Sequence, residues 1–200
     1  MADRIIVADD HPLFREGVVR NVKRLMPNAT IEQAASVAQV WQLAKAGSEP
    51  RLIVLDLCFP GTHGTAHIAD LRQAFPRTVI VVVSMLERPS VARQAMAAGA
   101  NGFIGKSVAA GQFCDTLLAA CAGQALVCLA DQPALACAAP VPLTPRQQDV
   151  LRLITAGKSN KEIARALGIS PFTVRIHVSS LFKALGVGTR TEAALRGLGL

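Results

Sequence analysis

The first 122 residues alternate short apolar runs, rich in β-branched residues, with longer segments of helical periodicity. This alternation predicts five strands, each followed by a helix. Strands and helices in strict alternation form a parallel sheet with helices on both faces, so we expect a five-stranded, doubly wound, flavodoxin-like α/β domain. The predicted strands are residues 4–8, 30–34, 52–55, 78–83 and 102–104, and the predicted helices are residues 12–25, 37–46, 64–75, 89–98 and 109–122.

The chain changes character after residue 122. Residues 123–142 contain three prolines, many alanines and no Lys or Arg, which predicts an apolar linker packed against one of the domains. Residues 143–200 predict a small all-helical domain. Ser159 and Glu162 form a capping box at one helix start, and further helices are predicted at residues 171–185 and 191–198.

Positive charge is concentrated in this last domain. Residues 143–200 hold nine Lys+Arg and three Asp+Glu, whereas residues 1–123 hold 12 and 10. A basic small domain favours binding to a polyanion such as DNA, although a basic surface that is merely solvated would have the same net charge. The five cysteines form no CxxC or Cys/His cluster, so the sequence supports neither a zinc site nor a disulfide framework. The seven-residue spacing of Cys114, Cys121 and Cys128 indicates small buried thiols on one helix face.

Polar residues stand at the carboxyl ends of four predicted strands. Asp9 and Asp10 follow the first strand, Asp56 the third, Ser84 the fourth and Lys106 the fifth. The carboxyl ends of parallel strands meet at one edge of the sheet, where ligand sites of such folds lie. Each residue alone has an ordinary interpretation as a turn, helix-cap or surface residue, but the combination indicates one site.

Three carboxylates close together repel one another unless a cation lies among them, and hard oxygen ligands in an open site suit Mg²⁺. A hydroxyl from Ser84 and an ammonium from Lys106 would neutralise charge on a transferred phosphoryl group. A carboxylate that is free to attack phosphorus, such as that of Asp56, then becomes an aspartyl phosphate.

The segments VADDHP, VLDLCFPG, VVSM and ANGFIGKS resemble the receiver domain of bacterial two-component response regulators across residues 1–122. The resemblance implies that a sensor histidine kinase phosphorylates Asp56, and that Asp9, Asp10, Asp56 and the backbone carbonyl of Cys58 hold Mg²⁺. It also implies that Lys106 pairs with the phosphate and that Ser84 moves to hydrogen-bond the phosphoryl group. Phe103 is then expected to swing inward as part of the switch, although simple core filling is an alternative.

The predicted helices 160–167 and 171–185, joined by a short Gly-containing turn, fit a helix-turn-helix pattern. In the second helix Val174, Val178, Leu181 and Leu185 form an apolar stripe that faces the domain core. The opposite face can enter a major groove, and it carries Thr173, Arg175, Ile176, Ser179, Ser180 and Lys183. Candidate phosphate contacts are Lys158, Asn160, Lys161, Arg165, Lys183 and Arg190, each of which can equally be a solvated surface residue.

The segments LTPRQQDVL, GKSNKEIARALGIS and TVRIHVSSLFKALGV resemble the LuxR-type DNA-binding domain over residues 143–197. With the receiver before it, the chain is similar to response regulators of the NarL/FixJ type. This resemblance implies base contacts from Arg175 and Ile176 and backbone contacts from Lys161 and Thr173. Ser179 departs from the family pattern, in which many members have lysine, so base specificity at this position is expected to differ.

The sequence therefore predicts a cytoplasmic, phosphorylation-controlled transcription factor rather than an enzyme, which binds paired DNA half-sites as a homodimer. A regulator that binds DNA without phosphorylation, with its receiver kept for partner contacts, is the alternative. A phosphohydrolase is disfavoured because Cys58 stands where a second acid is expected. Since neither Cys58 nor Leu86 can orient a water molecule well, we expect a long-lived phosphorylated state.

Overall fold

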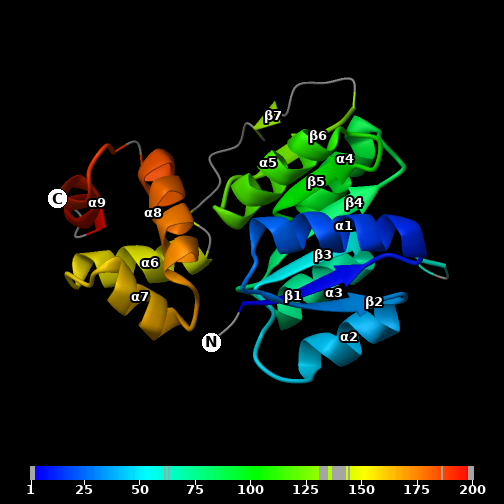
Figure 1. The fold of residues 1–200 in the computed structure, drawn as a ribbon. Helices are drawn as coiled ribbons and strands as arrows, with labels where there is room; N and C mark the ends of the chain where they lie inside the picture. The colour runs from blue at the N-terminus through cyan, green and yellow to red at the C-terminus, as the bar shows by residue number, and fades with distance from the viewer. Residues whose placement is uncertain are drawn as a thin grey trace.

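The computed structural model describes residues 3–60, 62, 64–130, 135–136, 143, 145–185 and 187–197. A parallel sheet with flanking helices is followed by a helical domain (Figure 1). The strands are β1 (Arg4–Ala8), β2 (Thr30–Ala34), β3 (Leu52–Asp56), β4 (Val79–Ser84), β5 (Gly102–Gly105), β6 (Leu126–Cys128) and β7 (Leu135–Ala136). The helices are α1 (Pro12–Leu25), α2 (Val37–Lys45), α3 (Ala66–Ala74), α4 (Pro89–Ala97), α5 (Ala110–Cys121), α6 (Pro145–Thr155), α7 (Asn160–Leu167), α8 (Pro171–Leu185) and α9 (Arg190–Gly197).

The sheet contains more strands than the sequence predicts. Its order within the described residues is β2-β1-β3-β4-β5-β6-β7, so the five expected strands are present and two short ones extend the β5 edge. β6 pairs in parallel with β5, and β7 pairs antiparallel with β6. Both come from the segment predicted as a linker. Its apolar residues complete the sheet because the edge of β5 would otherwise leave backbone groups unpaired.

The sheet separates two apolar cores. Alternate strand residues such as Ile53 and Val82 pack against α2, α3 and α4 on one face. Their neighbours, such as Val54 and Val81, pack against α1 and α5 on the other face. The central strands β3 and β4 are buried along their whole length, which is expected for a parallel sheet covered on both faces. The thiols of Cys114, Cys121 and Cys128 are buried, as predicted, but Cys128 lies in β6 and not on the helix that carries the other two. Burial raises the pKa of Cys121 to about 11.

The helical domain has its own core, which confirms the apolar stripe predicted for α8. Val174, Val178 and Leu181 are buried against α6 and α7, and Leu185 packs at the margin. The capping box of Ser159 and Glu162 starts α7, and Gly168 with φ 64° ends it in the left-handed conformation that glycine adopts most readily. This turn sets the direction in which α8 leaves α7.

The helical domain lies beside the edge at which the strands of the sheet begin (Figure 1). α8 packs against α5 of the first domain, so the two domains are in direct contact. Among the described residues no helix is both long and apolar enough to cross a membrane.

Candidate functional site

The polar residues predicted at the strand ends lie together. The register of β1 against β3 sets Asp9 and Asp56 at the same level of the sheet, and the two are only 2% and 1% exposed. On the other side of β3, the register of β4 against β5 brings Ser84 level with the residue before Lys106. Parallel pairing of four strands thus gathers side chains from four separate stretches of the sequence.

Lys106 joins the two buried carboxylates. Its Nζ atom lies 2.7 Å from Asp9 Oδ2 and 2.8 Å from Asp56 Oδ2. The ammonium also lies 4.7 Å from the centre of the Phe14 ring, a favourable cation–π contact. Burial works against the charged amine, but hydrogen bonds and charges from Asp56 and Asp9 outweigh it and raise the pKa of Lys106. One ammonium therefore compensates two carboxylates, and negative charge remains.

This remaining charge suits a cation. Ligand atoms of Asp9, Asp10, His11 and Asp56 all lie within 4.8 Å of one another. Asp10 Oδ1 is buried and accepts no hydrogen bond, although His11 Nδ1 lies 2.8 Å away. Carboxylate oxygens around an open position fit Mg²⁺, and a buried oxygen without a donor is the kind of atom that a metal would satisfy.

Cys58 and Ser84 lie beside Asp56. The Cys58 backbone N–H donates to Asp56 Oδ1 at 3.1 Å, and its sulfur lies 3.7 Å from Ser84 Oγ. The Ser84 hydroxyl is buried and accepts a hydrogen bond from the Leu86 backbone N–H at 3.0 Å. Cys58 is exposed at the opening of the site, and neither its side chain nor that of Leu86 carries a charged or amide group.

Phe103 differs from expectation. Its side chain is fully buried in the core on the α2–α4 face of the sheet. The added strand β6 pairs beside it, with Val127 opposite Phe103. The structure therefore has no exposed starting position from which this ring could swing inward.

Glu87 is a residue that the sequence analysis missed. Its carboxylate accepts hydrogen bonds from the backbone N–H groups of Ser107 (2.9 Å) and Ala130 (3.1 Å). Burial tends to raise the pKa of Glu87, but these bonds and one from the Ser107 hydroxyl lower it overall. A side chain on Gly105 would collide with this carboxylate. Glu87 thus ties the loop after Ser84 to the residue after Lys106, and nothing in the sequence distinguishes it from a surface glutamate.

The predicted DNA-reading face of α8 is only partly accessible. Arg175 and Ser179 are exposed and Ile176 is partly exposed. Thr173 and Ser180 are each 3% exposed, so the prediction that they lie on a free outer face is wrong for this structure. The reason is that Thr173 Oγ1 donates to Asp3 Oδ2 of the first domain at 3.0 Å, and Ser180 accepts from Gln147. The side chain of Lys183 lies outside the described part of the chain.

The remaining candidate DNA contacts lie around α7. Lys161 is exposed, and the Asn160 side-chain carbonyl accepts from Arg190 at 3.1 Å. Arg190 also donates to the backbone carbonyl of Lys158. Arg190 therefore joins α9 to the start of α7, and Lys161 is left free to meet a phosphate.

The outer face of α8 lies against α5. A groove of about 450 Å³ lies between them, lined by Leu118, Ala119 and Ala122 on one side and by Phe172, Arg175, Ile176, Ser179 and Ser180 on the other. The Gln147 side-chain amide donates to the Ala122 backbone carbonyl at 3.3 Å and closes one end of the contact. In this arrangement α5 lies against part of the α8 face that carries the base-reading candidates.

Family models match both domains. Residues 5–118 match the response regulator receiver domain, and residues 141–196 match the luxR family of bacterial regulatory proteins. Among solved structures, the receiver domain of the putative response regulator NarL from Mycobacterium tuberculosis is 33% identical, with a TM-score of 0.51 over 58% of this chain and 94% of that one. RcsB from Salmonella typhimurium covers the whole of both chains with a TM-score of 0.56, but at 20% identity it supports the fold alone.

Relatives align over nearly the full length. The nitrate/nitrite response regulator NarL of Escherichia coli K12 is 32% identical over 96% of this chain and 93% of its own length. The glycerol metabolism activator of Pseudomonas putida is 34% identical with the same coverage. These matches confirm the resemblances carried by both sets of motifs. The chain belongs to the response regulators of the NarL/FixJ type, which join a receiver domain to a LuxR-type DNA-binding domain.

Proposed function

We propose that Asp56 accepts a phosphoryl group from a sensor histidine kinase and that this modification controls DNA binding by the helical domain. The observation that carries the proposal is the buried contact of the Lys106 ammonium with Asp56 Oδ2 and Asp9 Oδ2, at the edge where the strands end. A receiver in front of a DNA-binding domain supports the same assignment.

In the transfer, a carboxylate oxygen of Asp56 forms a bond to phosphorus while the bond from phosphorus to the kinase histidine nitrogen breaks. The nitrogen keeps the electron pair. Lys106 stands ready to neutralise the incoming oxygens. When bound by Asp9, Asp10, Asp56 and the backbone carbonyl of Cys58, Mg²⁺ supplies further positive charge there.

A phosphoryl group adds a charge of about −1.5 to −2 and three strong acceptors. The Ser84 hydroxyl can turn to donate to one of them, which would release the Leu86 N–H that it now accepts from. Movement of Leu86 would then strain the hydrogen bonds that the next residue, Glu87, accepts from Ser107 and Ala130. Through these bonds the phosphoryl group would be connected to Ser107 and to Ala130, which follows β6.

Release of α8 is the output of this switch. The base-reading candidates Arg175 and Ile176 border the groove against α5, and Thr173 must leave Asp3 before it can contact DNA. These contacts support the proposal that α8 is masked in the unphosphorylated chain. The proposed DNA contacts after release are Asn160, Lys161, Thr173, Arg175, Ile176, Ser179 and Lys183.

We also infer the division of the chain into a receiver (1–122), a connecting segment (123–142) and a DNA-binding domain (143–200). RcsB has been solved bound to a promoter in the presence of a phosphomimetic, and with dimers on DNA. For this chain we propose a homodimer on paired half-sites about one helical turn apart. Chromosomal DNA as the partner implies a cytoplasmic location and a role as a regulator rather than an enzyme.

The test combines phosphorylation by a small phosphodonor with a measurement of DNA occupancy across the genome. Acetyl phosphate and Mg²⁺ should label the wild type and Asp70→Asn, an exposed control on α3, but not Asp56→Asn. Genome-wide occupancy should fall in Asp56→Asn and remain in Asp70→Asn. Labelling at Asp56 with unchanged occupancy in Asp56→Asn would favour the alternative, a regulator that binds DNA without phosphorylation.

A further inference from the structure

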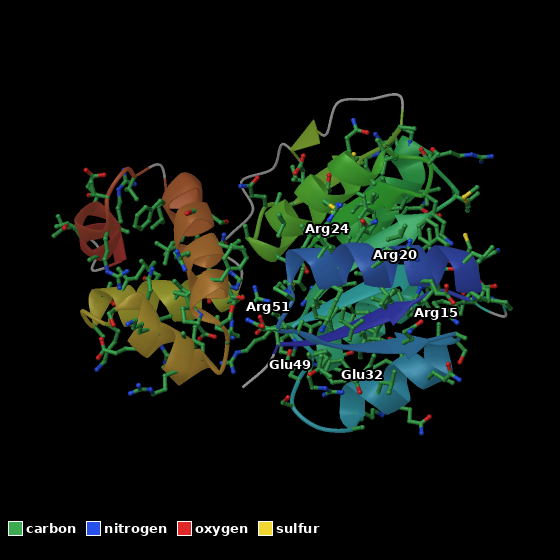
Figure 2. All side chains as sticks on the ribbon, viewed as in Figure 1. Arg15, Arg20, Arg24, Glu32, Glu49 and Arg51 are labelled. Atoms are coloured by element: carbon green, nitrogen blue, oxygen red, sulfur yellow. The ribbon has the colours of Figure 1, made fainter. Side chains whose placement is uncertain are left out.

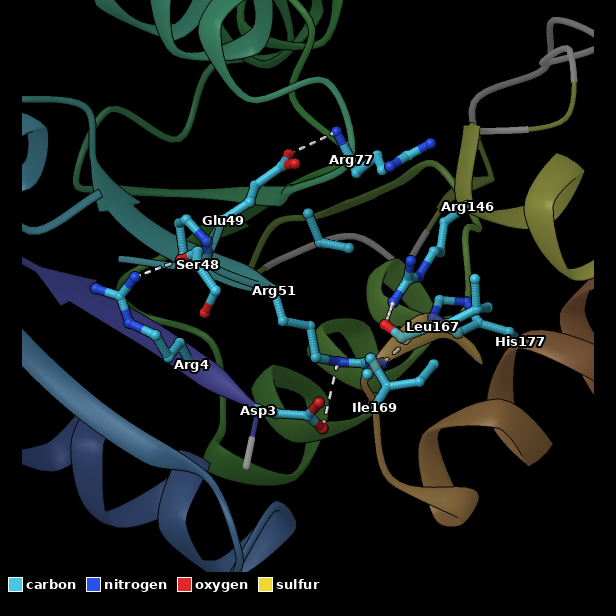
Figure 3. A pocket seen from close by; sticks show the side chains of 13 residues that line it. Asp3, Arg4, Ser48, Glu49, Arg51, Arg77, Arg146, Leu167, Ile169 and His177 are labelled. Atoms are coloured by element: carbon cyan, nitrogen blue, oxygen red, sulfur yellow. Dashed lines mark hydrogen bonds and ion pairs between the residues drawn. The ribbon is translucent and has the colours of Figure 1, made fainter. Parts of the chain in front are cut away.

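A cavity of about 270 Å³ lies between the two domains, at the edge where the strands of the sheet begin (Figure 3). Its walls come from the segments before β1, β3 and β4, and from α6, α8 and the turn between α7 and α8. It is far from Asp56, which lies at the opposite end of β3. The function proposed above makes no use of it.

The cavity is lined by four arginines and two acids. Three of the arginines have partners. Arg4 binds Glu32 at 2.7 Å, Arg77 lies 3.3 Å from Asp149, and Arg146 donates to the backbone carbonyl of Leu167 at 3.0 Å. The acids are Asp3 and Glu49. Glu49 accepts hydrogen bonds from the backbone N–H of Arg77 and from the Thr78 hydroxyl.

Arg51 is different because its charge is buried and poorly paired. Its side chain is 8% exposed, and its Nε and Nη1 atoms donate no hydrogen bond. The Asp3 Oδ2 atom lies 3.7 Å from Nε, beyond hydrogen-bond range, and already accepts from Thr173. Among the described residues, Nη2 lies 3.4 Å from His177 Nε2. Charged donors are rarely left unpaired in a protein interior, because their desolvation is then uncompensated.

Arg146 and His177 lie close enough to Arg51 to be influenced by its charge. Burial and the charges of Arg51 and Arg77 lower the pKa of Arg146, with Asp149 and Asp3 opposing them. Burial, followed by the charges of Arg51 and Arg146, lowers the pKa of His177 well below its ordinary value. His177 therefore stays neutral and leaves its buried Nδ1 atom without a partner. Acids lie close to all four arginines, but Arg51 makes no close hydrogen bond to its acid, Asp3.

Asp3 also has an unpartnered atom. Its Oδ1 is buried and accepts no hydrogen bond. A ligand that satisfies both Arg51 and Asp3 must carry acceptors for two N–H groups and also one donor. Hydrogen phosphate has such a set, since it bears negative oxygens and one O–H group. Sulfate offers the oxygens without the donor.

We propose that the cavity binds inorganic phosphate, or the phosphate group of a small phosphomonoester, and that the bound anion holds the helical domain against the receiver. Arg51 would donate from Nε and Nη1, Asp3 Oδ1 would accept from the ligand's O–H, and Arg77 and Arg146 would add charge at the rim (Figure 3). The volume equals that of roughly nine liquid waters, below the ~300–1,000 Å³ of typical small-molecule pockets. Phosphate fits this space better than a nucleotide does.

Direct binding is the first test. Inorganic phosphate should bind the unphosphorylated full chain at one saturable site in calorimetry at constant ionic strength, more tightly than sulfate and far more tightly than chloride. Arg51→Gln should weaken binding at least about tenfold, as loss of charge-assisted hydrogen bonds implies. Arg20→Gln is the matched control, because Arg20 is exposed on α1, away from the cavity (Figure 2).

Two further measurements distinguish a loss of the binding site from misfolding of the Arg51→Gln variant. Arg77→Gln changes an exposed rim residue and should weaken binding a few-fold in a folded protein. In the wild type, the Nε–H resonance of Arg51 should shift on titration with phosphate. No saturable binding, or equal binding in Arg51→Gln and the wild type, would overturn the proposal and leave water as the occupant. Sulfate bound as well as phosphate would overturn the role of Asp3.

The effect on domain closure rests on the masking proposed above. At matched ionic strength, phosphate should lower the DNA affinity of the unphosphorylated wild type and not that of Arg51→Gln. If phosphate binds at Arg51 but does not lower the DNA affinity, the proposed effect on domain closure is wrong and the binding site itself is retained. Labelling of Asp56 is measured independently, so failure of the anion site and failure of the phosphorylation switch give different results.

Discussion

The two ends of β3 carry buried clusters of opposite charge. At the end where the strand finishes, Asp56 and Asp9 share one ammonium, from Lys106, at 2.7–2.8 Å. At the end where it begins, the described carboxylate paired with Arg51 is that of Asp3, at 3.7 Å, and Arg146 of the same sign lies nearby. The first cluster is tightly bonded and short of positive charge, whereas Arg51 in the second cluster is only loosely paired.

The difference shows how one rigid sheet can serve two events. The acidic end is built from a single domain and remains intact when the domains separate. The arginine end is shared between domains, because Thr173 and His177 of α8 complete it. Separation of the domains would expose Arg51 and Asp3 to water, which relieves their poor pairing. The arginine end therefore opposes tight docking and makes α8 releasable.

The largest expected effect comes from the acidic end. Lys106→Met keeps the apolar stem beside Phe14 but leaves two buried carboxylates without a cation, which should cost roughly 3–5 kcal/mol in the free energy of unfolding. Mg²⁺ should restore more stability to this variant than to the wild type. Denaturant unfolding with and without Mg²⁺ measures both. Lys45→Met is the control, since Lys45 also lies over an aromatic ring, Trp41, but is exposed. Equal losses in the two variants would contradict the shared-cation interpretation.

The residue at the opening of the Asp56 site, Cys58, is expected to set the lifetime of the phosphorylated state. Cys58 is exposed beside Asp56 and cannot orient a hydrolytic water, so the wild-type phosphoprotein should be long-lived. Cys58→Asn supplies an amide there and should shorten the lifetime by up to about 100-fold. Loss of label over time, on phosphate-affinity gels, is the measurement. Met85→Gln, at an exposed position on the neighbouring loop, should leave the lifetime unchanged. A wild-type lifetime of seconds would refute this reading of Cys58.

Much of the acidic end could be predicted from the sequence, because it follows from local patterns. Hydrophobic periodicity placed the strands, parallel strands end at one edge, and the residues after them, such as Asp56 and Lys106, therefore had to meet. The arginine end could not be predicted this way. Its central bond joins Asp3 to Thr173, which are 170 residues apart, and depends on how two domains dock. β6 and the Glu87 contacts were missed for the same reason, since each needs a partner distant in the sequence.

A single substitution should weaken docking at the arginine end. Asp3→Ala removes the acceptor of Thr173 and the carboxylate that is paired with Arg51 in the described part of the chain, so the unphosphorylated chain should open more often. DNA affinity without phosphorylation should rise about tenfold, in line with ~1–3 kcal/mol for a lost buried hydrogen bond. Fluorescence anisotropy with a bound promoter fragment measures it. Glu16→Ala, which removes an exposed acid on α1, is the control for net charge. An unchanged affinity in Asp3→Ala would mean that this contact does not hold α8.

The smallest effect is a response of docking to pH through His177. In the docked state, burial and the charges of Arg51 and Arg146 hold the pKa of His177 well below 6.5, while Asp3 is the acid of this cluster. Once α8 is released, the pKa should return to near 6.5. Because the docked pKa is the lower one, docking is fully stable above pH 6.5 and weakens as pH falls below it.

Uptake of one proton by His177 when α8 is released predicts that the docking equilibrium weakens about fourfold at pH 6 relative to pH 7.5. An interdomain distance, measured by energy transfer between labels on α2 and α9, separates this effect from the pH dependence of DNA binding. His177→Gln keeps an acceptor for Arg51 but cannot titrate, so its distance distribution should stay constant over this range. His67 also has a pKa lowered by burial, but it lies in α3 within the receiver and should not change the distance. A pH response that persists in His177→Gln would assign it to another group and leave the arginine end without a titrating residue.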